Sequence, residues 1–222
     1  MKKIKALIIG SVFLSLSAFT TSAIALEGYS VGASMNYAGF YAHGKETNHA
    51  RVIEETGAFQ DTHPAVFLEA NINDTITVGL EYVATGISTP TNENAQFDHQ
   101  DGGSDSQKTN KASVEFDDYM SLYVNINTGF LGTYLKAGIS RVDIVSTEDL
   151  GTGGAYGNTD TKGVLLGLGV SRDLDQGLFV RLEAVAHQYD DVDLTNENDS
   201  QKKIEIFDMI GAHAALRIGK TF

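Results

Sequence analysis

Apolar and polar residues alternate with a period of two along most of the chain after its first 25 residues. Between residues 29 and 41, for example, Val31 and Met35 fall on one face and Gly32 and Asn36 on the other. This period is typical of a β-strand with two different faces. The same alternation predicts seven further strands, over 66–72, 76–82, 119–126, 134–139, 164–171 and 178–186 and in a last stretch that closes on Phe222.

The connections between these strands alternate in length. Three are tight turns, at 73–74, 129–132 and 173–176, and four are long and polar, at 42–63, 87–116, 146–161 and 190–203. The 23 glycines and only two prolines also favour strands joined by turns. Short turns at one end, long loops at the other and an even strand number are features of transmembrane barrels. The pattern predicts an all-β fold, an eight-stranded antiparallel up-and-down transmembrane β-barrel with four long extracellular loops and three short periplasmic turns.

The N-terminal residues have the composition of a secretory signal peptide. Lys2, Lys3 and Lys5 precede an apolar run over 6–19, and Ala23 and Ala25 form the small-residue cleavage pattern. We therefore predict a cleaved leader at 1–25 and a barrel domain at 26–222. The alternative is a leader that stays uncut as a membrane anchor.

The net charge limits which molecules the protein can bind, and the cysteine content limits how it can be stabilised. The chain has 16 basic and 29 acidic residues and a net charge of −13, which becomes about −16 without the three lysines of the leader. So acidic a protein is not expected to bind nucleic acid, or anionic lipid over its bulk surface. The chain has no cysteine, so disulfides cannot stabilise the exported protein.

The end of the chain carries a further signal. Ala214, Leu216 and Ile218 alternate before a terminal Phe222, and Lys220 is the one departure from this apolar pattern. With these residues the chain resembles the small eight-stranded outer-membrane barrels, the family that includes the outer-membrane protein A transmembrane domain and its porin-like relatives. The resemblance implies a monomer in the outer membrane of a Gram-negative bacterium, with both termini periplasmic. It also implies contact with membrane lipid and lipopolysaccharide, and a C-terminal aromatic residue that the barrel assembly machinery recognises.

Six charged residues are predicted to point into the barrel, at similar distances from the short-turn end. They are Glu69, Glu81, Lys136, Arg181, Glu183 and Arg217. Three acids and three bases in one layer can satisfy one another. Such a layer could gate ions or protons, or it could be a packed polar core that blocks passage. The narrow interior of eight strands favours the blocking core, and the resemblance agrees, because the outer-membrane protein A barrel has an internal salt-bridge cluster.

The sequence offers little for catalysis or metal binding. His187 and His213 are predicted to point inward without a neighbouring serine, so we interpret them as core histidines. His43, His49 and His63 are too irregularly spaced for a metal site. We expect no catalytic residue, no cofactor and no resident metal.

The acidic stretch after His187 faintly resembles a calcium-binding loop. If that loop began at Asp191, Asn196 would replace the glycine of its sharp turn and Lys202 its last glutamate. A solvated acidic loop is the simpler interpretation, with weak divalent-ion bridging to lipopolysaccharide phosphates as its functional form.

The sequence therefore predicts a non-enzymatic integral outer-membrane protein with a role in envelope integrity or surface interaction, and a lumen plugged by its charged layer. The alternative is a narrow porin-like channel for ions or small molecules, including hydrophobic ones.

Overall fold

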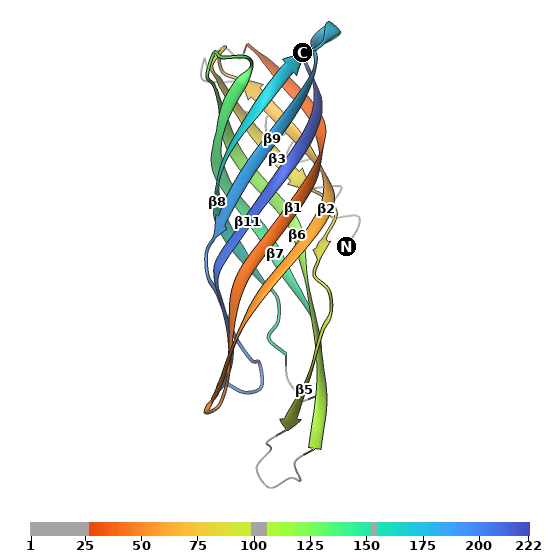
Figure 1. Ribbon diagram of the computed structural model, residues 1–222, viewed down its shortest axis with the longest axis vertical. Helices are drawn as coiled ribbons and strands as arrows, with labels where there is room; N and C mark the ends of the chain where they lie inside the picture. The colour runs from red at the N-terminus through yellow and green to blue at the C-terminus, as the bar shows by residue number, and fades with distance from the viewer. Residues whose placement is uncertain (1–26, 99–105, 152–154) are drawn as a thin grey trace.

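The chain forms a closed antiparallel β-barrel (Figure 1). The structure is a computed structural model, and it describes residues 27–98, 106–151 and 155–222. The predicted leader, 1–25, lies outside these described residues. The wall consists of β1 (Gly28–Asn48), β2 (Arg51–Asn71), β3 (Ile76–Val83), β6 (Ser106–Asn127), β7 (Thr133–Leu150), β8 (Thr159–Asp173), β9 (Leu178–Tyr189) and β11 (Lys202–Thr221).

Each of these strands pairs with the next, and the pairing of β1 with β11 closes the ring. Three short strands extend the wall toward one end. β4 (Ile87–Ser88) and β5 (Asn92–Asp98) pair with β6 beyond β3, and β10 (Val192–Thr195) pairs with β11 beyond β9. The all-β, eight-stranded, up-and-down architecture predicted from the alternation is confirmed.

The long connections contain much more strand than the sequence indicates. The stretch 42–63 was expected to be a loop, yet the pairing of β1 with β2 runs without a break from Gly28↔Asn71 to Asn48↔Arg51. β6 and β7 likewise stay paired as far as Asn110↔Leu150. The long hairpins project together at one end, opposite the short turns and the C-terminus (Figure 1). Beyond the apolar belt of the wall neither face of these arms has to be apolar, so the alternation that reveals a strand disappears.

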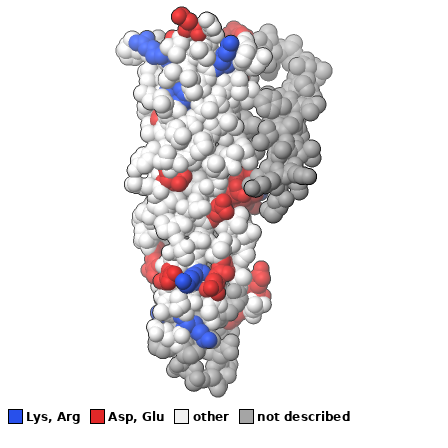
Figure 2. Space-filling view, turned by 90° about the vertical axis from the view of Figure 1, so that its right-hand side faces the viewer, with Lys and Arg blue, Asp and Glu red and all other residues white. Residues whose placement is uncertain are grey.

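The outward face of the wall is apolar along the predicted alternation. Leu122, Leu135, Leu166, Leu182 and Leu216 are all at least half exposed. On the face in Figure 2, charged side chains gather at the short-turn end and toward the hairpins, and few appear in the band between them. No helix among the described residues has the length and apolarity to cross a bilayer.

The wall is incomplete on one side of its hairpin half. β2 pairs with β3 only from Val66↔Tyr82 to Asn71↔Thr77, so in the described part of the chain residues 51–65 have no ladder partner on that edge. Pro64 lies next to the point where the pairing stops. Proline lacks the N–H that a central strand needs, and it is tolerated at such an edge.

Candidate functional site

Arg217 of β11 lies at the centre of a charged layer across the lumen. Its side chain is fully buried, and its Nη1 donates to Glu183 Oε1 and Oε2 of the adjacent β9, at 2.9 and 2.8 Å. Its Nη2 lies 2.8 Å from Glu81 Oε2 of β3 and donates to the Tyr123 hydroxyl of β6 at 2.8 Å. Because β3 and β6 lie across the ring from β11, this one guanidinium spans the barrel.

The other predicted charges join the same layer. Lys136 Nζ of β7 donates to Glu183 Oε2 at 2.9 Å, and Arg181 Nη1 of β9 donates to both oxygens of Glu69 at 2.7 Å. Glu69 also accepts from the Tyr123 hydroxyl at 2.9 Å. Each of the six charged residues thus forms an ion pair with another member, and three acids balance three bases. Five of the side chains are at most 5% exposed, and Arg181 is 13% exposed.

Aromatic rings pack this layer against glycines on neighbouring strands. Four glycines each lie directly opposite an aromatic residue whose ring occupies the space that a Cβ would take: Gly32 with Phe67, Gly79 with Tyr123, Gly169 with Tyr134, and Gly219 with Phe179. The rings also contact the charges. The guanidinium carbon of Arg217 lies 4.1 Å from the Phe67 ring centre, and Lys136 Nζ lies 3.9 Å from that of Tyr123. Such cation–π contacts are favourable where water is excluded.

The two inward histidines lie beyond this layer, toward the hairpins. His187 Nε2 and His213 Nδ1 are 3.0 Å apart, and the Tyr119 hydroxyl lies 3.4 Å from His187 Nδ1. His213 Nε2 is buried without a hydrogen-bond partner. Sequence reasoning placed both histidines inward but could not show that they contact each other, because the alternation does not fix the register of β9 against β11.

The three histidines between residues 42 and 63 lie apart from one another. His43 stacks on Phe207, and His49 Nε2 lies 3.5 Å from Asp199 Oδ2 near the hairpin ends. His63 is buried in the lumen, where its Nδ1 lies 3.1 Å from Asp61 Oδ2. Sequence reasoning missed this Asp61–His63 pair, although a two-residue spacing puts both side chains on one face of a strand. Among the described residues, no three acidic or histidine side chains are close enough to hold a metal ion.

Arg141 and the C-terminal residues lie on the outward face. Arg141 of β7 pairs with Asp160 at 3.1 Å and with Asp143 at 3.0 Å. The β6–β7 pairing has a bulge close to Arg141, but the bulge lies on β6, where Asp118 has a φ of 51°, and Arg141 stays on the outward face. Phe222 stacks on Tyr29 with ring centres 5.2 Å apart, and Lys220 Nζ lies 5.2 Å from the Phe222 ring centre. Ala214, Leu216 and Ile218 alternate along the outer face of β11, as their spacing predicted.

A closed antiparallel barrel with an apolar outer belt and a charged lumen defines an integral outer-membrane protein. The model of the outer membrane protein beta-barrel domain family matches residues 11–206, and the chain belongs to that family. No curated protein matches the sequence.

Several solved structures are similar to this chain at low sequence identity. The outer membrane protease OmpT from Escherichia coli is 9% identical, with a TM-score of 0.46, and the match covers 91% of this chain and 99% of that one. OprG from Pseudomonas aeruginosa is 13% identical, with a TM-score of 0.45, and the match covers 89% of this chain and 99% of that one. Neisserial surface protein A is 12% identical, with a TM-score of 0.37 and coverages of 86% and 99%.

Proposed function

We propose that this protein is a non-enzymatic outer-membrane barrel with a sealed lumen, which supports envelope integrity and presents its long hairpins to the outside. The observation that carries the proposal is Arg217, which is fully buried and bonded at once to Glu81, Glu183 and Tyr123 from different sides of the barrel. An ion that crossed this level would have to break several charge-assisted hydrogen bonds in a water-poor lumen.

Other features support the same role. The described histidines have tyrosine, histidine, aspartate or asparagine as side-chain partners, and none of these pairs joins a histidine to a serine hydroxyl, as a serine hydrolase would require. The partners are membrane lipid and lipopolysaccharide around the apolar belt, and the barrel assembly machinery at the C-terminal strand. A monomer is the simplest assembly for this role, because β1 pairs with β11 of the same chain and no second copy is needed to close the ring. Both termini and the short turns face the periplasm.

Conductance in planar bilayers tests the sealed lumen directly. The purified wild-type barrel should give no steady openings at high protein load. Arg217→Ser should admit water between Glu81 and Glu183 and give cation-selective openings. Steady openings of the wild type would contradict the proposal and favour a narrow channel. As a matched control for channels caused by poor folding, Lys45→Ser on an exposed hairpin pair should remain silent.

A further inference from the structure

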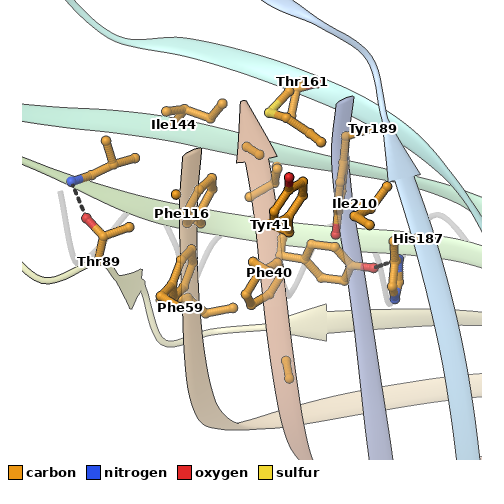
Figure 3. A pocket seen from close by; sticks show the side chains of 18 of the residues that line it. Phe40, Tyr41, Phe59, Thr89, Phe116, Ile144, Thr161, His187, Tyr189 and Ile210 are labelled. Atoms are coloured by element: carbon orange, nitrogen blue, oxygen red, sulfur yellow. Dashed lines mark hydrogen bonds between the residues drawn. The ribbon is translucent and has the colours of Figure 1, made fainter. Parts of the chain in front are cut away.

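The lumen contains a cavity of about 400 Å³ on the hairpin side of the charged layer. Its walls are mainly apolar, and they include the stacked rings of Phe40, Phe59 and Phe116, whose centres are 4.8 to 6.1 Å apart. Figure 3 shows these rings beside one another, with His187 and Tyr189 farther along the cavity. This volume lies in the range of cavities that hold small organic ligands.

The cavity ends at the charged layer and opens toward the hairpins, and the unpaired edge of β2 borders it at residues 57–59. Its floor includes Glu81, which the charged layer holds through Arg217. Toward the hairpins it meets a second, more polar chamber of about 460 Å³, and Val114 and Ile206 line both. A molecule could therefore enter from the hairpin side and could not leave past the charged layer. This dead-end geometry rests on the proposed function, whereas the presence of the cavity does not.

One wall of the cavity carries polar atoms that lack a partner. Asn36 is fully buried, its Nδ2 donates to Ser34 Oγ, and its Oδ1 accepts no hydrogen bond. His63 lies directly opposite Asn36 on β2, and His213, with its unpartnered Nε2, lies diagonally across from it on β11. Buried polar atoms without partners are costly, so a ligand or water that satisfied them would be held strongly.

We propose that this cavity binds a small, neutral, apolar molecule with one hydroxyl group, taken up from the outside. The aromatic walls suit a compact apolar body. A hydroxyl is the group that can donate its one hydrogen to Asn36 Oδ1 and at the same time accept from an Nε2–H of His213. A charged head would instead lie beside Glu81 and the charged layer, whose ions already neutralise one another.

Naphthol, naphthalene and naphthoate form a matched set of probes for this site. The protein has no tryptophan, so the fluorescence of each probe can be followed in protein-loaded nanodiscs, with empty nanodiscs as the blank for partition into lipid. We expect saturable binding of naphthol, roughly twofold to tenfold tighter than that of naphthalene, as expected for one net hydrogen bond. Naphthoate should bind more weakly than either. Equal affinities for naphthol and naphthalene, or binding no greater than in empty nanodiscs, would overturn the proposal.

Two variants assign the binding to this cavity. Asn36→Ala should abolish the preference for naphthol and leave naphthalene binding intact, an effect that general loosening of the barrel would not produce. Ala38→Phe should fill the cavity and reduce both affinities at least tenfold, whereas Ala137→Phe on the lipid-facing side should bind as the wild type does. The heat-dependent shift of a folded barrel on a gel confirms that each variant has folded. Unchanged binding in Ala38→Phe would refute the site, while conductance of the wild type would refute only the sealed lumen.

Discussion

Gly32 of β1 lies directly opposite Phe67 of β2, and the Phe67 ring fills the space that a side chain at position 32 would occupy. The Ile218 carbonyl on the other neighbouring strand approaches the same position. The glycine thus leaves room for the aromatic ring against the wall, and the face of this ring contacts the Arg217 guanidinium. The same arrangement recurs at three other strand pairs of the charged layer.

We expect Gly32→Ala to lower the free energy of unfolding by about 1–3 kcal/mol, because the added methyl overpacks a tight site. Gly39→Ala in the same strand is the matched control, since a Cβ at that position meets nothing within 4 Å. Urea unfolding in lipid vesicles, followed by circular dichroism, measures both. A loss of similar size in the two variants would show that the Phe67 ring does not specifically require a glycine opposite it.

Arg217 should be the most sensitive position of the charged layer. Arg217→Met leaves Glu81 and Glu183 short of a buried counter-ion, so we expect a loss of about 3–5 kcal/mol in the free energy of unfolding. Removing one of the stranded charges in Arg217→Met/Glu81→Gln restores neutrality to the layer and should recover part of that loss. A double variant as unstable as the single one would mean that charge balance is not what stabilises the layer.

The exposed ion pair of Lys45 and Glu205 contrasts with the buried ion pairs of the charged layer. Their side chains are 33% and 41% exposed, and they lie opposite each other on the paired strands β1 and β11, where water and salt screen the interaction. Lys45→Met should therefore leave the unfolding transition unchanged within error. Urea unfolding at low and high salt checks this, and a clear loss at low salt would show that the hairpins contribute to barrel stability.

Ionisation of Tyr156 makes the stability of the protein depend on pH. It lies between β7 and β8, its N–H donates to Glu148 Oε2 at 2.9 Å, and burial together with the Glu46 carboxylate raises the pKa of its hydroxyl to about 12. The ordinary value is near 10. The folded state therefore keeps this proton while the unfolded state loses it, so the associated stability is complete below pH 10 and is lost as the pH rises toward 12.

The ultraviolet absorbance of tyrosinate measures this ionisation. The difference between the titrations of wild type and Tyr156→Phe should show one step with a midpoint near 12. A midpoint near 10 would mean that water reaches the Tyr156 hydroxyl freely in the folded protein.

The sequence predicts those parts of the barrel in which the surroundings differ on the two sides of a strand. Lipid outside and a crowded lumen inside impose the alternation of Leu135 with Lys136, and of Leu182 with Glu183, so the pattern shows which side chains, including the charges, point inward. Beyond the bilayer this asymmetry ends. The pairing of residues such as Gly44 with Glu55 is consequently invisible in the sequence, although it makes a hairpin from what resembles a loop.

The cavity and its polar wall also cannot be predicted from the pattern of individual strands. Asn36, His63 and His213 come from three strands, and their proximity depends on the stagger of β1 against both β2 and β11. The alternation places each side chain inside the barrel but leaves its height relative to the others undetermined. The charged layer could be anticipated only because its members lie at similar distances from the short turns.

Substitution of Phe222 can separate an effect on assembly in the cell from an effect on the stability of the folded barrel. Its ring stacks on Tyr29, and the backbone N–H of Phe222 donates to the Tyr29 carbonyl at 2.9 Å, an interaction that survives a change of side chain. If the assembly machinery recognises the terminal aromatic residue, Phe222→Ala should lower the amount of folded barrel in the outer membrane several-fold. Tyr29→Ala removes the same stacking and should have a much smaller effect. Equal losses in the two variants would assign the role of Phe222 to packing.

The orientation of the barrel can be tested with single cysteines, because the natural chain has none. Val52 is 53% exposed near the end of the first hairpin, and Asp74 is exposed in the short turn between β2 and β3. Long hairpins outside and short turns inside are the usual arrangement of such barrels. A maleimide too large to pass through porins should therefore label Val52→Cys on intact cells, and Asp74→Cys only after the outer membrane has been permeabilised. Equal labelling of both after denaturation controls for reactivity and expression. Labelling of Asp74→Cys alone on intact cells would require the barrel to be inverted, with the hairpins and the open end of its cavity facing the periplasm.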